Sequence, residues 1–508
     1  MKLTLTALRV FLCAGVVLTI LSCSRHTDPN TLVMIIESSP TNLDPRVGQD
    51  AQSQRIDGLI FDNLLTRDEH LNAAPGIASK WDIPDPLTYV FHLRNGVKFH
   101  DGRPLTSRDV KWSFDSLMQG KVRSSKGATF RFVDRIDAPD DATVVFHLKE
   151  PSSTLLWNLA SAAMGIVPFG SGEEISQHPI GSGPFRFVSA ELDKEVVLEG
   201  NSEYWGDKPH LSRVRLTVVP DTTTRALELR KGSADITPSN SLTSDMVLSL
   251  KQDASLEVLS PPGTVLAYMG FNLHDPILKN RRVRQALAYA LDRRPLIHYL
   301  WRDFARPANS VLPPESWAYG DTGSYDYDPV RARKLLDDAG YPAHDGVRFH
   351  LAMKTSTEES SRLMASVFQQ QLRDVGIVLD IRTFEFATFF ADVTHGEFQM
   401  YSLRWVGGNE DPDIFDLVFH SSRFPPNGSN RGYYSNPRVD ALIDQGRREI
   451  DQSKRKQIYA ELQKILLEDL PYINLWYFDN VLVHSKRVHG MKLDPSGSYD
   501  FLKTATLQ

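Results

Sequence analysis

The strongest constraint on how this chain folds is that its two halves follow different hydrophobic patterns, with no low-complexity linker between them. At 508 residues, the chain exceeds the size at which a single hydrophobic core stops growing, so two or more lobes are expected. The second half alternates helical and strand patterns, which is typical of the α/β class. There we predict helices at 280–291, 329–339, 358–374, 387–395, 436–449 and 454–469, and strands at 347–353, 377–383, 399–405 and 472–476.

The first half is richer in β-branched and aromatic runs separated by turn residues, which favours strands and hairpins. The run at 87–93 is one such strand, and the Asn95-Gly96 pair that follows it is a hairpin signal. Thr106 followed by Asp109 resembles a helix capping box. Two packed lobes with a cleft between them are therefore expected, and such clefts are common ligand sites.

The N-terminus has the pattern of a secretory signal. Two positive charges precede an apolar stretch at 10–21, which is shorter than the roughly 20 residues that a bilayer-spanning helix needs. The stretch runs into the letters ILSC at 20–23, which resemble a bacterial lipobox, where the cysteine is acylated and becomes the first mature residue. We expect a lipoprotein signal peptide at 1–22, lipidation of Cys23 and a tether at 23–30; plain cleavage beside an incidental cysteine is the alternative.

Charge, cysteine content and motifs argue against several classes of function. The net charge is −6, and the sequence contains no long basic run. There is therefore no electrostatic basis for binding nucleic acid. Once Cys13 is removed with the signal and Cys23 is lipidated, no thiol remains for a disulfide, a zinc site or catalysis. The sequence has no HExxH, Walker or GxGxxG motif, and His484 and His489 are expected at the surface. We expect no cofactor, no metal site and no catalytic residue.

One acidic and aromatic stretch, LRWVGGNEDPDIF at 403–415, needs a separate interpretation. Asn409, Asp411 and Asp413 imitate the start of a calcium-binding loop. Ile414, however, stands where such a loop requires glycine. Neighbouring carboxylates on a turn rarely face each other as an acid/base pair would need. The stretch is therefore a candidate ligand-binding loop rather than a metal or catalytic centre.

Several phrases, taken in order, resemble the extracytoplasmic solute-binding proteins of the dipeptide/oligopeptide (family 5) ABC-transporter family. They include TYVFHLRNGVKFHDG at 88–102, YWGDKP at 204–209, the stretch at 403–415 and NRGYYSNP at 430–437. Together the matching phrases cover nearly all of residues 30–480.

The resemblance implies a two-lobed α/β fold of the periplasmic-binding-protein type (type II, large peptide-binder class) that closes on a ligand. Lobe I would comprise 31–265 plus 481–508, with an extra subdomain at 59–180, and lobe II would comprise 266–480. The chain would be a monomer in the periplasm or at the cell surface, held at the membrane by its lipid anchor. It would bind a small molecule or short peptide and deliver it to an ABC permease, without being an enzyme.

The family also implies where the ligand lies. The stretch at 403–415 runs off a strand into the cleft, and its tryptophan, here Trp405, lies against the ligand. In the peptide binders an aspartate three residues later pairs with the peptide's α-ammonium, whereas this chain has Gly408. A buried ammonium without its counter-charge costs about 3–5 kcal/mol. The ligand-binding residues implied are Ser39, Thr41, Asn42, Leu403, Arg404, Trp405, Val406, Gly407, Gly408, Asn409, Asp411, Arg431 and Tyr433.

Three interpretations of the altered loop remain open. The lost carboxylate and the gained Arg404 would together favour a ligand without a free α-amine, carrying a carboxylate, a phosphate or a hydroxyl-rich face. Alternatively, Arg404 braces the loop by pairing with Glu410, Asp411 or Asp413. Alternation along the strand favours bracing, because it points Arg404 away from Leu403 and Trp405. Thirdly, Glu410 or Asp411 replaces the missing carboxylate and restores peptide binding.

The loop at 37–43 is the second part of the implied site, since the peptide family contacts the ligand backbone just after the first strand. Its alternative role is structural: Asn42 and Asp44 shape the turn before Pro45. Two other functions also stay open, namely a secreted hydrolase, and a ligand sensor or chaperone that keeps this fold without a transporter.

Overall fold

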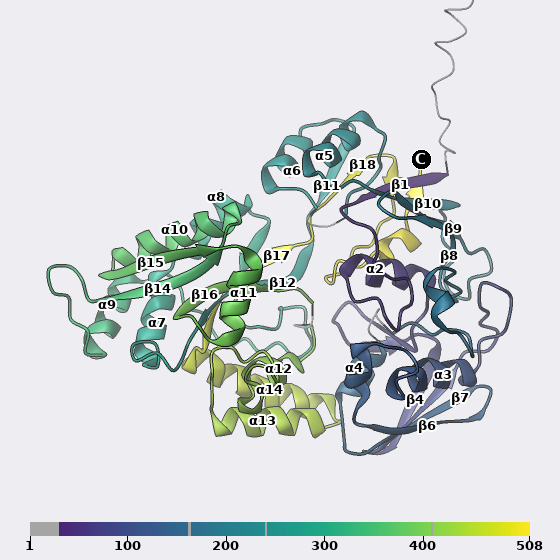
Figure 1. The fold of residues 1–508 in the computed structure, drawn as a ribbon, viewed down its shortest axis with the longest axis horizontal. Coiled ribbons are helices and arrows are strands. Elements are labelled where there is room, and N and C mark those ends of the chain that lie inside the picture. The colour runs from purple at the N-terminus through teal and green to yellow at the C-terminus, as the bar shows by residue number, and fades with distance from the viewer. Residues whose placement is uncertain (1–29, 161–163, 239–240, 408–409) are drawn as a thin grey trace, which may run out of the picture.

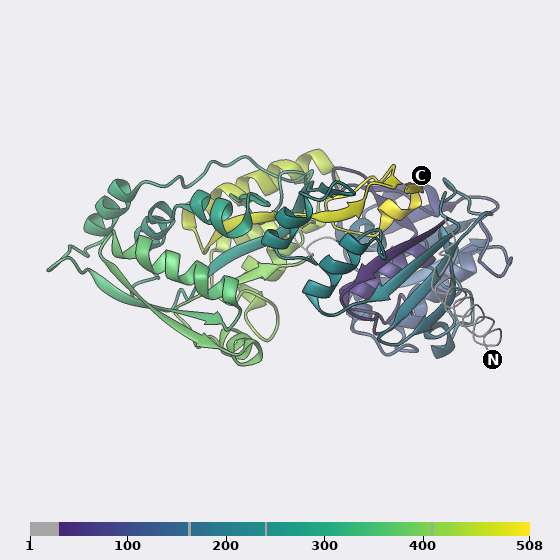
Figure 2. The ribbon, with the colours of Figure 1, turned by 90° about the horizontal axis from the view of Figure 1, so that it is seen from above.

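A computed structural model describes residues 30–160, 164–238, 241–407 and 410–508. They form two lobes that lie side by side along the longest axis of the molecule (Figure 1). Seen from above, one lobe contains both the beginning and the end of the described chain (Figure 2). Strands β12 (Pro262–Phe271) and β17 (Tyr472–Asp479) lie where the two lobes meet. Among the described residues, no helix is both long and apolar enough to cross a bilayer.

The first sheet of lobe I has the strand order β1-β10-β9-β8. Strands β1 (Thr31–Ile36) and β10 (Arg213–Val218) are parallel, and the other pairs are antiparallel. The chain's last segment returns to this lobe, because β18 (Leu482–Ser485) pairs with β11 (Leu256–Leu259). The remaining elements are β8 (Phe185–Glu191), β9 (Glu195–Gly200), β19 (Val488–His489), β20 (Thr506–Leu507), α2 (Ala51–Ile60), α5 (Thr222–Lys231), α6 (Ser244–Leu250) and a 3-10 turn at Asp500–Lys503.

A second hydrophobic core in the same lobe lies under the antiparallel sheet β4-β5-β7-β6. The rings of Phe91 and Phe114 both meet Phe146 edge to face, with centroids 5.6 and 5.4 Å apart. The elements are β2 (Leu65–Arg67), β3 (Ala73–Pro75), β4 (Ala78–Asp85), β5 (Thr88–Leu93), β6 (Val133–Asp140), β7 (Thr143–Leu148), α3 (Ser107–Met118), α4 (Thr154–Leu159) and 3-10 turns at Ser125–Phe130 and Glu173–Ser176. The capping box predicted at the start of α3 is confirmed.

Lobe II is built on a six-stranded sheet of order β13-β17-β12-β16-β14-β15. Because side chains alternate along a strand, the sheet separates two cores: Met269 of β12 belongs to one and Tyr268 to the other. The elements are β13 (Ala305–Pro307), β14 (Phe349–Ser356), β15 (Ile377–Phe384), β16 (Met400–Trp405), α7 (Arg281–Ala290), α8 (Arg293–Trp301), α9 (Pro329–Asp338), α10 (Glu359–Arg373), α11 (Phe386–His395), α12 (Ile414–Phe419), α13 (Pro437–Arg448), α14 (Gln452–Asp469) and a 3-10 turn at Ser421–Arg423.

The predicted α/β alternation of the second half is confirmed, since each predicted helix and strand is present within a few residues. Two local predictions are wrong. Gly96 makes the expected turn at φ +79°, but β5 pairs with β4 and β7 rather than forming a hairpin with the residues that follow it. His484 is buried in β18, not at the surface, and this burial lowers the pKa of its imidazole.

Candidate functional site

The end of β16, at 403–405, lies near the junction of the lobes (Figure 1). Strand β16 runs antiparallel to β12, and its last residue, Trp405, stands opposite Leu266 near the start of β12. Strand β14 is parallel to β16, so the two strands present their carboxyl ends at the same edge of the sheet. In open α/β sheets, ligands bind at this edge.

Trp405 and Arg431, both predicted site residues, lie together. The Trp405 ring stacks on Tyr268, with centroids 5.7 Å apart and planes inclined by 11°. The guanidinium carbon of Arg431 lies 5.4 Å from the centroid of the Trp405 ring, and its Nη1 donates to Tyr268 Oη over 3.3 Å. Leu403 packs against the same core as Trp405. Two distant segments of the sequence therefore meet on one face of the sheet.

A narrow pocket opens beside these residues, and half of the residues that line it are aromatic. Two buried polar atoms in its lining, Trp405 Nε1 and Tyr472 Oη, lie close to each other and have no other hydrogen-bond partner within the described part of the chain. Burial raises the pKa of the Tyr401 and Tyr472 hydroxyls well above the usual value, so both stay neutral. The lining residues are Tyr268, Gly270, Phe271, Tyr401, Trp405, Val418, Phe419, Ser429, Asn430, Arg431, Gly432, Tyr434, Pro471 and Tyr472.

Arg431 supplies the positive charge of this region. Besides Trp405 and Tyr268, its guanidinium faces the ring of Phe390, 5.3 Å from the centroid. Among the residues that the structure describes, no carboxylate lies within ion-pair distance of Arg431. A half-buried guanidinium with aromatic neighbours and spare donors is well suited to a carboxylate or phosphate.

Sequence reasoning missed an aromatic pair on α11. The rings of Phe386 and Phe390 are stacked with centroids 6.0 Å apart, and they are 55% and 39% exposed. Phe389, between them, is buried. The run of phenylalanines at 386–390 was the available signal, but a helical pattern does not tell which ring faces the core and which faces Arg431.

Arg404 lies on the other face of β16 from Trp405. Its guanidinium faces Phe478 and Trp301, 4.7 and 5.4 Å from the ring centroids. Its nearest carboxylate is Glu358 at 3.8 Å, a loose and partly exposed contact. The expected pairing of Arg404 with the acidic residues of its own loop is wrong, because its carboxylate contact is with Glu358, while Glu410 and Asp413 pair with Arg67 and Arg447. The structure does not bring Arg404 together with Trp405 and Arg431.

The acidic residues of the loop are either paired with an arginine or buried. Glu410 accepts from Arg67 Nη1 over 2.6 Å and from Thr264 Oγ1 over 3.1 Å. Asp411 is buried, and this burial raises the pKa of its carboxyl to about 6. Asp413 pairs with Arg447 Nε at 2.7 Å. The idea that Glu410 or Asp411 supplies the missing ammonium anchor is therefore not favoured.

The polar side chains after β1 are used to shape their own loop. Ser39 Oγ accepts from the backbone N–H of Asp193 over 2.7 Å. The Thr41 hydroxyl donates to the Asp50 carboxylate. Asn42 Oδ1 accepts from the backbone N–H of Asp44 over 2.8 Å. These bonds support the structural alternative for Asn42.

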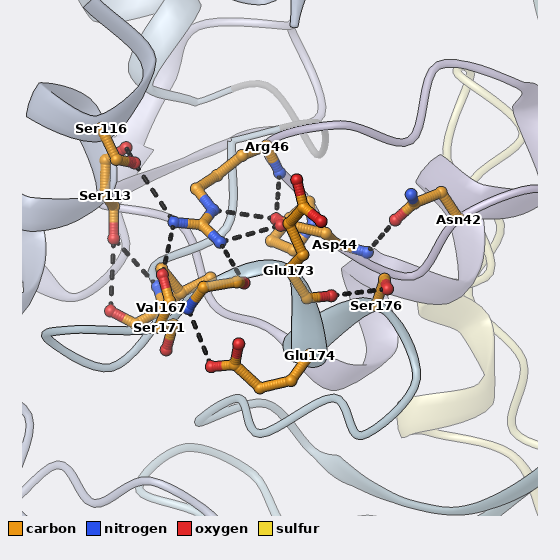
Figure 3. A network of polar contacts seen from close by, with 12 residues as sticks. Asn42, Asp44, Arg46, Ser113, Ser116, Val167, Ser171, Glu173, Glu174 and Ser176 are labelled. Atoms are coloured by element: carbon orange, nitrogen blue, oxygen red, sulfur yellow. Dashed lines mark hydrogen bonds and ion pairs between the residues drawn. The ribbon is translucent and has the colours of Figure 1, made fainter. Parts of the chain in front are cut away.

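A buried ion pair holds the same loop in place (Figure 3). Arg46 donates to both carboxylate oxygens of Asp44 over 2.9 and 2.8 Å, and both side chains are 2% exposed. Arg46 also donates to the backbone oxygens of Ser171 and Gly172, each over 3.1 Å. The loop after β1 is thus fixed to residues 171–172, which lie far along the sequence and just before the 3-10 turn at Glu173–Ser176.

The remaining predicted residues are spread around the site. Tyr433 packs on His274, with ring centroids 4.6 Å apart, rather than on Trp405. Val406 is 71% exposed, and Gly407 adopts φ +70°. Gly408, Asn409 and Cys23 lie outside the described residues. The described ranges contain no cluster of His, Cys, Asp or Glu placed to hold a metal ion.

Comparison with known proteins gives consistent matches over most of the chain. The family model for bacterial extracellular solute-binding proteins, family 5 Middle, matches residues 72–425. The dipeptide-binding protein of Escherichia coli (strain K12) is 27% identical, over 96% of this chain and 96% of that protein. The glutathione-binding protein GsiB of Pectobacterium atrosepticum is 30% identical, over 92% of this chain and 93% of that protein. The solved structure of HbpA2 from Haemophilus parasuis has a TM-score of 0.84 at 26% identity, covering 94% of this chain and 100% of that one.

These matches confirm both the resemblance seen in the sequence and the two-lobed α/β fold that it implied. The relatives are solute-binding proteins rather than enzymes. The chain belongs to the bacterial extracellular solute-binding proteins of family 5.

Proposed function

We propose that this chain is a lipid-anchored solute-binding protein that captures a small ligand between its lobes and delivers it to an ABC permease. Members of this family deliver peptides or related ligands to ABC importers. The observation that carries the proposal is the meeting of Trp405 and Arg431 at the carboxyl end of β16, where the lobes join. The anchor would be Cys23, and the mature monomer would work in the periplasm or at the cell surface.

The domain boundaries stated from the sequence belong to the same proposal. Lobe I would end near 265 and resume at 481, with the extra subdomain at 59–180. In support, β12 and β17 lie at the junction, and β18 pairs with β11 of lobe I. The separate core around Phe91 and Phe146 supports the extra subdomain. Closure of two such lobes buries the ligand between them.

The ligand would carry an acidic group and would not need a free α-amine. Three observations support this charge preference: the aspartate of the peptide binders is replaced by Gly408, Glu410 is already paired with Arg67, and Arg431 has no carboxylate partner among the described residues. Arg431 thus takes the role first considered for Arg404. The exposed Phe386 and Phe390 would pack against an apolar part of the ligand.

The ligands named for the relatives carry a group that Arg431 could bind. Dipeptides and glutathione, for which the two relatives are named, both carry carboxylates. Charge-assisted hydrogen bonds from a guanidinium to a carboxylate are among the strongest that proteins make. What would distinguish this chain is that the partner for the ammonium end is missing.

Uptake by living cells tests the proposed function. Cells lacking this chain, and cells complemented with the wild type, are compared for depletion of acidic solutes from a defined mixture. We expect wild-type complementation, but not Trp405→Ala, to restore depletion of one solute class. Arg438→Ala is the matched control, because Arg438 pairs with Glu461 on the exposed surface of α13 and α14.

Disrupting the permease separates transport from sensing. If the chain feeds an importer, loss of the permease abolishes depletion to the same extent as loss of the chain. Unchanged depletion in both strains would contradict the proposal.

A further inference from the structure

One side chain of lobe I reaches the altered loop of lobe II. Arg67 is the last residue of β2, and its Nη1 lies 2.6 Å from Glu410 Oε2. The two side chains are only 20% and 6% exposed. They are 343 positions apart in the sequence. The contact therefore joins a separate part of the fold to the segment that follows Trp405.

Both partners of this ion pair are held in place. The guanidinium carbon of Arg67 lies 3.7 Å from the centroid of the Trp157 ring of α4, which fixes its orientation. The second carboxylate oxygen of Glu410 accepts from Thr264 Oγ1 over 3.1 Å. Each oxygen of Glu410 thus has a donor, and its charge is balanced by Arg67.

The neutralised carboxylate of Glu410 is connected through Thr264 to the strand that faces Trp405. Thr264, which binds it, precedes Leu266 by two residues on β12, and Leu266 stands opposite Trp405. Two residues of strand span roughly 7 Å. Without Arg67, Glu410 would present a negative charge within reach of a ligand that lies against Trp405.

We infer that Arg67 is a specificity-determining residue: from lobe I it neutralises Glu410 and so denies a ligand's ammonium group the counter-charge next to Trp405. The inference rests on the proposed function and extends it to the residue that excludes free amines. Since the two partners come from different lobes, the masking of Glu410 depends on the lobes being together. Removal of the Arg67 charge should convert the site toward ammonium-bearing ligands.

Binding of a matched ligand pair tests the inference directly. The mature protein, purified from its cell envelope, is titrated with alanyl-leucine and with N-acetyl-alanyl-leucine, which differ only at the amine. In Arg67→Gln we expect the affinity for the free dipeptide, relative to the acetylated one, to rise at least tenfold over wild type. Arg67→Met, which keeps the packing on Trp157 without the charge, should show the same rise, and Arg67→Lys should show none.

Two further variants show whether the change in the ratio of affinities comes from the charge of Glu410 or from a weaker contact between the lobes. Arg302→Gln is the matched control, because it removes an exposed ion pair at 2.8 Å between α6 and the residue after α8 without touching the loop. It should leave the ratio of affinities unchanged. The double variant Arg67→Gln with Glu410→Gln should lose the gain, because the unmasked carboxylate is gone.

The two levels of the proposal fail in different ways. A wild-type preference for the free dipeptide contradicts the proposed ligand class, whatever the variants do. An unchanged ratio in folded Arg67→Gln and Arg67→Met, or a gain that survives in the double variant, overturns the role of Arg67. Thermal unfolding of each variant shows that the protein measured is folded.

Discussion

The guanidinium carbon of Arg431 lies 5.4 Å from the centroid of the Trp405 ring, so a positive charge stands over an aromatic face at the end of β16. Tyr268 supports both residues, by stacking on Trp405 and by accepting from Arg431. In the neighbouring loop, Glu410 and Asp413 pair with other arginines and Asp411 is buried. The candidate site therefore combines aromatic walls with an excess positive charge, which is the basis of the predictions that follow.

Removing the charge of Arg431 should weaken ligand binding strongly. Hydrogen bonds to charged groups contribute about 1.5–3 kcal/mol, so Arg431→Ala should raise the Kd of an acidic ligand roughly 10- to 150-fold. Arg431→Lys should recover part of this loss, because the charge remains but the planar fork is lost. Calorimetric titration measures the effect, and an Arg431→Ala Kd equal to that of Arg438→Ala would contradict it.

Replacing Trp405 should separate packing from charge. In Trp405→Phe the ring that stacks on Tyr268 is kept in smaller form, and we expect at most a modest loss of affinity. Trp405→Ala removes the wall altogether and also uncovers the face under Arg431, so its loss should be at least tenfold. Equal affinities of both variants and wild type, by the same titration, would mean that the ligand does not touch this ring.

The buried Asp411 should make stability depend on pH in a defined direction. Burial raises the pKa of its carboxyl to about 6, above the usual 3.8, so the folded state holds the proton more tightly than the unfolded state. The free energy of unfolding should therefore fall as pH rises from about 4 to 7, by up to roughly 3 kcal/mol from this group. Urea unfolding at pH 4.5 and pH 7 measures the change.

Asp411→Asn tests that assignment. An amide oxygen can still accept from the backbone N–H of Asp413, so the loop is preserved. The variant should be more stable than wild type at pH 7 and should show a flatter pH dependence. Asp207→Asn, at an exposed position, serves as the control and should follow wild type. A destabilised Asp411→Asn at pH 7 would show that the ionised carboxylate is needed.

The buried pair of Arg46 and Asp44 should be essential for the loop after β1. Arg46→Ala leaves Asp44 buried without its partner, which costs about 3–5 kcal/mol of unfolding free energy. Arg103→Ala breaks an exposed pair with Asp101 and should cost less than about 1 kcal/mol. Denaturant unfolding compares the two variants, and similar small costs would show that the buried network is dispensable.

Membrane attachment should depend on Cys23. Each buried methylene of an acyl chain contributes about 0.8 kcal/mol, and two or more chains are needed for stable anchoring. We expect Cys23→Ser to move the chain from the membrane fraction to the soluble fraction, or to leave it with its signal uncleaved. A membrane-bound, cleaved Cys23→Ser protein would exclude the lipid anchor.

The sequence predicted the features that depend on local periodicity. The helices of lobe II were predictable because their apolar residues recur at helical spacing. Arg404 was expected on the other face of the strand from Trp405 because strand side chains alternate. The partners of Glu410 and Arg46 were not, since Arg67 and Ser171 lie 343 and 125 positions away. The sequence offered three carboxylates near Arg404 as pairing partners, but in the fold Glu410 pairs with Arg67, Asp413 pairs with Arg447, and Asp411 is buried.

The exposed phenylalanines of α11 illustrate a second limit. Phe386 and Phe390 carry no polar group, and a one-dimensional pattern assigns such residues to a core. Only the placement of α11 beside Arg431 shows that these rings remain available at the site.

Native mass spectrometry of the mature protein, purified without unfolding from its own cells, tests the central claim most directly. A single added mass of an acidic compound without a free α-amine, retained by Arg438→Ala and lost from Arg431→Ala, is the expected result. A set of masses matching free-amine peptides, retained by Arg431→Ala, would contradict it.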